Sequence, residues 1–248
     1  MAVVEAECEL YLAGPGAMND IVRDTLAACV ALQYERSCYY WAMSGSLSKG
    51  EQTRNAIIAR ALGIVSEVGY EGLSIGVLAR ETKLSKSGLF AHFKSKEALQ
   101  LGVVQEVINR FTLRVVHPAL TSPRGEPRLR VLFEKKLEWI CGAEEQQRGC
   151  LLNKASIEYD NRAGHPVRER VVQALQDWRE VVMRSARAAI DEGHFRADLD
   201  ADQFADEFDG IMMMYQQRHG LMHDRTAAER ARGAFESLLE RSRRSRPR

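Results

Sequence analysis

The chain has 248 residues, which is enough for two hydrophobic cores, and 45% of them are apolar. Six prolines and few strand-like alternations of apolar and polar residues favour an all-helical fold over a mixed one, and no run reaches the roughly eighteen apolar residues of a membrane span. The net charge of +1 says little by itself, because basicity is local: residues 49–100 hold eight Lys or Arg against five Asp or Glu. This modest excess favours specific docking over a general nucleic-acid coat.

The first 48 residues are acidic, with two Lys or Arg against six Asp or Glu. A Gly-Pro-Gly sequence at 14–16 interrupts them, and the apolar spacing from Ile21 to Tyr34 is compatible with a helix. We expect residues 1–48 to be an N-terminal extension that is either disordered or, if translation begins at Met43, not translated. An acidic arm is a poor reader of the minor groove.

A helix is predicted from Thr53 to Val68, at the start of a compact head. Apolar residues recur there at helical spacing, and Gly69 follows where the pattern ends. The apolar stripe consists of Ile57, Ala61, Ile64, Val65 and Val68.

Two short amphipathic helices separated by a tight polar step are predicted between Leu73 and Phe93. Ser74 is placed to cap the first helix, and Ser85 the second, which runs for about two turns to His92. Four lysines and a histidine lie between residues 83 and 96 with no acidic residue among them. The pattern is typical of a helix-turn-helix, whose second helix reads DNA. The expected packing residues are Ile75, Leu78 and Ala79 on the first helix and Leu84, Leu89 and Phe93 beyond the step.

Ser95 is placed to cap a third helix with an apolar stripe of Leu99, Val103, Val107 and Phe111. We expect Pro118 to stop this helix. Its first turn carries Lys96 beside free backbone amides, an arrangement that binds anions.

At these positions the chain resembles the TetR family of bacterial transcriptional regulators. Members of that family show a Gly-aromatic turn, here Gly69 and Tyr70, and then an apolar residue with Ser or Thr, here Leu73 and Ser74. The family's S-K-x-x-L-F/Y-x-H-F-x-S-K-E-x-L stretch corresponds to SKSGLFAHFKSKEAL from Ser85 to Leu99. The likeness covers about fifty residues in the correct order.

A looser likeness to the regulatory half of one TetR subgroup continues at residues 127–140 and 148–162. Two positions in the head depart from the family pattern. Lys83 stands where the turn usually has Gly, and a non-Gly residue at positive φ is uncommon. Phe90 stands where many members have Tyr, so it lacks a phenolic hydrogen bond to phosphate but retains apolar contact with a thymine methyl.

The resemblance implies a homodimer whose recognition helices enter successive major grooves of a pseudo-palindromic operator of double-stranded DNA. Lys86 and Ser87 are the expected readers of base edges, and Phe90 and Ala91 the expected contacts to thymine methyls. The residues expected to hold phosphates are Ser74, His92 and Lys96.

Beyond Pro118, a proline-rich linker to residue 127 is expected to lead into a second helical domain. Pro127 is placed to start one helix and Gly193 to end another. Asp200 with Gln203, and Thr226 with Glu229, have the spacing of capping boxes. The predicted helices span about 128–142, 150–160, 167–192, 201–220 and 226–243.

The last two predicted helices each carry an apolar stripe. The simplest interpretation is that both stripes close the domain's own core, whereas the resemblance implies that this helix pair packs against its symmetry mate as a four-helix bundle. The predicted interface residues are Phe204, Phe208, Ile211, Met212, Tyr215, Phe235, Leu238 and Leu239.

The resemblance also implies a small-molecule effector bound inside the second domain. Aromatic residues from different helices are candidates for the pocket wall, although aromatic residues at helical spacing are more often plain core. The candidates are Phe111, Trp139, Tyr159, Trp178 and Met183.

The sequence gives few signs of catalysis, redox chemistry or metal binding. The chain lacks G-x-x-x-x-G-K-[ST], H-E-x-x-H and G-x-S-x-G, so no enzyme and no cofactor is expected. Five cysteines without a C-x-x-C pair suit a reducing cytoplasm. His219 and His223 have ligand spacing but no evident third partner, so no metal site is expected.

We therefore expect an all-α protein with an N-terminal helix-turn-helix DNA-binding domain at 49–117, which includes the connecting helix. A C-terminal ligand-binding and dimerisation domain is expected at 118–243, with a basic tail at 244–248. The predicted function is a ligand-responsive transcriptional repressor that a small molecule releases from DNA. The alternative is a helical ligand-binding or structural dimer that has lost operator recognition.

Overall fold

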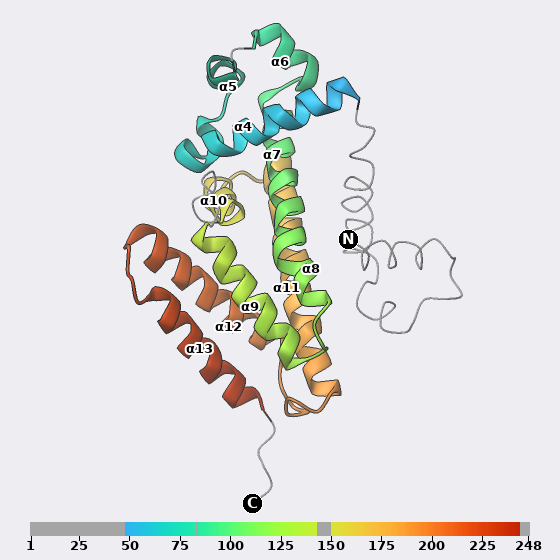
Figure 1. Cartoon of the computed structure of the whole chain (residues 1–248), viewed down its shortest axis with the longest axis vertical. Helices are drawn as coiled ribbons and strands as arrows, with labels where there is room; N and C mark the ends of the chain where they lie inside the picture. The colour runs from blue at the N-terminus through green and yellow to red at the C-terminus, as the bar shows by residue number, and fades with distance from the viewer. Residues whose placement is uncertain (1–47, 83, 143–149, 244–248) are drawn as a thin grey trace, which may run out of the picture. The chain divides into compact units, whose positions relative to one another are not determined.

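The computed structural model describes residues 48–82, 84–142 and 150–243, and the regular elements in these ranges are helices (Figure 1). An isolated bridge between Phe195 and Arg243 is the one strand-like feature of this part of the chain. The all-α fold predicted from the sequence is confirmed. None of the described helices has the length and apolarity needed to span a bilayer. The predictions for residues 1–47, Lys83 and the tail at 244–248 lie outside the described residues.

Helix α4 (Lys49–Gly72) begins four residues before the predicted start at Thr53. Its start is a reciprocal capping box: the Glu51 amide donates to the Ser48 hydroxyl at 3.3 Å, and the Ser48 amide donates to the Glu51 carboxylate at 2.9 Å. Gly69 has φ 77° and interrupts the helical backbone where the sequence predicted the end.

Helices α5 (Ile75–Thr82) and α6 (Lys86–His92) are the predicted pair. The Ser74 hydroxyl accepts from the Val77 amide at 3.2 Å, and the Ser85 hydroxyl accepts from the Gly88 amide at 3.0 Å, so both predicted caps are confirmed. Leu78, Leu89 and Phe93 are buried in the hydrophobic core, whereas Leu84, expected to pack, is exposed.

Helix α7 (Lys96–Phe111) does not stop at Pro118. It continues through a π turn (Thr112–Val116) into α8 (His117–Leu120), and Pro118 lies in the first turn of α8. The prediction that proline ends this helix was wrong because the preceding turn is wider: the His117 amide donates to the Thr112 carbonyl, five residues back, which accommodates a residue without an N–H. The predicted boundary between residues 117 and 118 therefore falls inside continuous helical backbone.

We call α4 to α7 the head, and the helices from α9 to α13 form the body of the molecule. Helix α11 packs against α7, α9, α10 and α12, and α12 packs against α13 (Figure 1). The predicted helices are present, and their ends differ from the predicted ones by at most four residues. The observed elements are α9 (Glu126–Cys141), α10 (Leu151–Glu158), α11 (Pro166–Asp191), α12 (Ala201–Gln216) with a π turn (Gln217–Leu221), and α13 (Ala227–Ser242).

The two predicted capping boxes of the body are realised unequally. The Asp200 carboxylate caps α12 by accepting from the Gln203 amide at 3.1 Å, but the Gln203 side chain donates to Glu207 instead of back to the cap. Thr226 does not cap α13 with its side chain. Its hydroxyl and amide both donate to the Asp224 carboxylate, at 2.7 and 2.8 Å, and these bonds lower the pKa of Asp224 to about 2.

Candidate functional site

The predicted recognition helix is presented on a buried support. Leu89 of α6 is fully buried against the head, while Lys86, Ser87, Phe90 and Ala91 are exposed. Phe90 leaves 49% of its surface exposed to water, which is unfavourable for a phenyl ring unless a binding partner covers it. The four residues predicted to contact bases therefore share the solvent-exposed side of one rigidly seated helix.

The three residues predicted to contact phosphate lie at helix ends. Ser74 caps α5, and His92 ends α6 half-buried. Lys96, in the first turn of α7, is already engaged: its ammonium donates to the Glu71 carbonyl at 3.0 Å and lies 3.4 Å from the Glu71 carboxylate. A phosphate would have to share Lys96 with Glu71. Sequence reasoning did not single out Lys94, which is exposed at the α6–α7 step and has the same charge.

The predicted effector residues do not form a single cluster. Phe111 stands between two tryptophans, with ring centroids 5.5 Å from Trp139 and 5.1 Å from Trp178, both in edge-to-face arrangement. Tyr159 lies elsewhere, against Tyr70 of the head at 6.3 Å. Met183 is buried on α11, five residues after Trp178 and thus on another side of that helix.

An ion pair between a buried lysine and a half-buried aspartate, which the sequence did not indicate, adjoins this aromatic cluster. The Lys136 ammonium lies 2.8 Å from the Asp209 carboxylate and 4.1 Å from the centre of the Trp178 ring. The Trp178 indole also donates to Asp209, at 2.7 Å. The indole N–H of Trp139 is buried and has no hydrogen-bond partner among the described residues, so it is a donor available to an acceptor brought from outside.

The structure corrects the predicted dimer interface. Seven of the eight residues are 0–3% exposed in the single chain, so their side chains leave no surface for a partner; only Ile211 is partly exposed. Phe208 shows why: its ring is 5.7 Å from Phe133 and 5.5 Å from Phe235, inside the body's own aromatic core. The buried seven are Phe204, Phe208, Met212, Tyr215, Phe235, Leu238 and Leu239.

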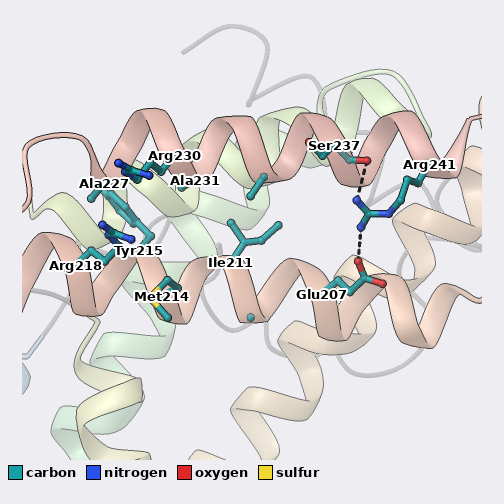
Figure 2. Close-up of a pocket in the computed structure, with 12 residues that line it drawn as sticks. Glu207, Ile211, Met214, Tyr215, Arg218, Ala227, Arg230, Ala231, Ser237 and Arg241 are labelled. Carbon is teal, nitrogen blue, oxygen red and sulfur yellow. Dashed lines mark hydrogen bonds and ion pairs between the residues drawn. The ribbon is translucent and has the colours of Figure 1, made fainter.

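A groove of about 470 Å³ lies between the same two helices, and two of the predicted interface residues, Ile211 and Tyr215, are among those that line it (Figure 2). Ile211 and Met214 of α12 lie across from Ala231 of α13, and the ion pair between Glu207 and Arg241, at 2.6 Å, closes one end. The large apolar side chains exposed along this part of the chain are Met213, Met214, Leu221 and Met222.

The contact between head and body includes a polar network that was missed from the sequence. The Glu158 carboxylate of α10 accepts from the amides of Tyr70 and Glu71, at 3.2 and 2.9 Å. Arg162 reaches Glu71 at 2.6 Å. Burial opposes ionisation of Glu71, but the hydrogen bond from Arg162 and the charge of Lys96 outweigh it and hold the pKa of Glu71 below its usual value. About ninety residues separate these partners, so no local pattern could have indicated them.

The cysteines and histidines of the described residues form no disulfide or metal-binding cluster. Cys141 is exposed and Cys150 buried, with no disulfide between them, and the other three cysteines lie outside the described residues. His219 stacks on Tyr215 at 5.3 Å. Across the described ranges, no three metal-ligating side chains are grouped around a common point.

Two family models match the chain. Residues 57–103 match bacterial regulatory proteins of the tetR family, and residues 125–235 match a tetracyclin repressor-like C-terminal domain. The two matches together span more than half of the chain and coincide with the head and the body.

Individual proteins agree with these matches. The chain is similar to the HTH-type transcriptional repressor DhaR of Mycobacterium sp. (strain GP1), with 24% identity over 155 residues that cover 62% of this chain and 75% of DhaR. It is similar in fold to a TetR regulator from Chloroflexus aurantiacus J-10-FL, at 24% identity and a TM-score of 0.69 over 78% of this chain and 96% of that one. It is also similar to AibR, solved with isovaleryl coenzyme A and operator DNA, at 18% identity and a TM-score of 0.61 over 75% and 97% of the two chains.

Proposed function

The chain belongs to the TetR family of transcriptional regulators, and from that premise we propose that it is a homodimeric repressor whose operator is released by a small molecule. The observation that carries the proposal is the exposed side of α6. Lys86, Ser87, Phe90 and Ala91 face water there on a helix held by buried Leu89, with no carboxylate on the helix to repel phosphate.

The dimer is proposed to form through the outer sides of α12 and α13. Met214 lines the groove between these helices, and Met213, Leu221 and Met222 are exposed on α12 or just after it. A single protomer rarely leaves so many large apolar side chains of one segment uncovered. A Cβ added at Gly210 or Gly233 would meet nothing within 4 Å, so both helices have open surface for close approach. A second copy related by a two-fold axis would complete a four-helix bundle.

The effector is proposed to bind beside Phe111, Trp139 and Trp178. The unpartnered indole N–H of Trp139 offers a hydrogen bond to a carbonyl or carboxylate of the ligand, and the flanking rings offer apolar contact. The solved complex of AibR with isovaleryl coenzyme A and operator DNA shows that a protein of this fold binds both kinds of partner. The name of DhaR supports repression as the sign of regulation.

The proposed mechanism links the two sites through α7. This helix begins in the head at Lys96, carries Phe111 at its end, and packs along α11 of the body. A ligand that binds one orientation of α7 more tightly than another would change the separation of the two heads. It would weaken DNA binding by the difference between its binding free energies for the two orientations.

Selection of duplexes from a random pool by the purified full chain tests the proposal. Enrichment of an inverted repeat with half-site centres about 34–36 Å apart is expected. Lys86→Ala should weaken binding of the selected duplex, whereas Lys135→Ala, which removes an exposed lysine from α9, should not. A pool that shows no enrichment at low salt would instead support a helical dimer without operator recognition.

A further inference from the structure

The turn that leads from α4 into the helix-turn-helix is held from the body. Gly69 breaks the helical backbone at φ 77°, and Leu73 and Ser74 begin the approach to α5 only four and five residues later. The amides of Tyr70 and Glu71 are the donors of this turn, and both are bound by the Glu158 carboxylate of α10. The body thus holds the backbone at the point where the DNA-reading unit starts.

A second contact from the same helix complements the first. Lys154 lies one helical turn before Glu158, so the two side chains share a side of α10. The Lys154 ammonium donates to the Ser66 carbonyl at 2.7 Å, while Glu158 accepts from amides beyond Gly69. One side of α10 therefore binds carbonyl and amide groups on both sides of the break in α4.

The positive φ of Gly69 and the approach of the Glu158 carboxylate both favour glycine at this position. A Cβ added at Gly69 would lie 2.6 Å from a carboxylate oxygen of Glu158, and the positive φ there already disfavours other residues. On the opposite side, the buried Gln100 side chain of α7 donates to the Tyr70 carbonyl at 2.7 Å. The turn is thus bound by α10 through its N–H groups and by α7 through a carbonyl.

We propose that Lys154 and Glu158 form an interdomain clamp that fixes the orientation of α5 and α6, which makes both positioning residues for operator binding. The inference rests on the proposed function and deepens it. Tyr159 follows Glu158 directly and packs edge-on against Tyr70, so a displacement of α10 moves the carboxylate and the ring together. When the clamp is released, the body no longer fixes the orientation of α5 and α6.

Hydrogen exchange of the full chain without DNA tests the clamp itself. Glu158→Gln keeps the size and one acceptor oxygen, Glu158→Ala removes both acceptors, and Glu138→Gln is the matched control, since Glu138 is an exposed carboxylate on α9. Amides from Tyr70 to Phe93 should exchange about tenfold faster in Glu158→Ala, less so in Glu158→Gln, and unchanged in the control. Exchange in α11, α12 and α13 should not change.

Three results would overturn the clamp. Unchanged exchange in the head would show that the two hydrogen bonds do not hold it, and an equal increase in every helix would show a general stabilising role. Faster exchange without loss of affinity for the selected duplex would show that orientation is set elsewhere; a loss of about tenfold is expected. If the wild-type chain selects no duplex, the proposed function fails, while the exchange experiment still judges the clamp.

Discussion

Replacing Met214 by Glu should separate the proposed dimer and leave each protomer folded. Met214 keeps 51% of its surface exposed beside the groove of α12 and α13, so a partner would cover about half of the side chain. Full burial of a methionine contributes about 1.5–3 kcal/mol, and a two-fold interface contains the residue twice, so the lost apolar contact alone amounts to about 1.5–3 kcal/mol per dimer. Each new carboxylate left unpaired in the seam adds to this loss.

Sedimentation of the variant at micromolar concentration decides the prediction, with far-UV circular dichroism to verify that the helices remain. The dissociation constant of the dimer should rise by about tenfold to a hundredfold. Leu113→Glu is the matched control, because Leu113 is 56% exposed on the π turn after α7, away from the groove. A Met214→Glu variant that sediments as the wild-type dimer would refute the assignment of this groove, and equal effects of the two variants would point to general destabilisation.

Three further results are expected. Lys86→Ala should cost about 1–3 kcal/mol at the selected operator and relax preference at one base pair per half-site, whereas equal weakening on random DNA would mean contact with phosphate alone. Phe208→Ala should lower the free energy of unfolding in urea by about 3–5 kcal/mol, because its ring packs on Phe133 in the core; a loss below about 1 kcal/mol would contradict that packing. Arg243 and Arg130 hold the pKa of Glu126 below its usual 4.5 although burial opposes them, so this carboxylate stabilises the fold above that pH and less as the pH falls below it. The difference in melting temperature between wild type and Glu126→Gln should therefore shrink from pH 7 to pH 3, and a difference independent of pH would refute the linkage.

The head could be predicted in detail because its determinants are local. The spacing of apolar residues marked each helix, and Ser74 and Ser85 cap helices in the structure as the sequence indicated. The exposure of Phe90 follows from the same period, since the residue directly after the buried Leu89 points away from the core. Pro118 shows the limit of such reasoning: a proline stops a regular helix, but a π turn formed by the preceding residues accommodates it.

The proposed dimer surface could not be predicted from the sequence because α12 is apolar on more than one side. The sequence places Phe208 and Met214 on one helix six residues apart, and periodicity cannot say which of them meets the protomer's own core. The structure answers this by surrounding Phe208 with Phe133 and Phe235 and leaving Met214 beside the groove. The same ambiguity would affect any helix that must pack on both its own domain and a partner.

The sequence by itself determined the helices, their caps and the family, because these depend on residues within a few positions of one another. The tertiary structure alone decided which groups meet across distance: Lys136 with Asp209, and Glu158 with the amides after Gly69. Such contacts depend on how helices far apart in the chain pack together. Every residue except proline carries the same backbone N–H group, so the sequence does not indicate which amide a distant carboxylate will bind.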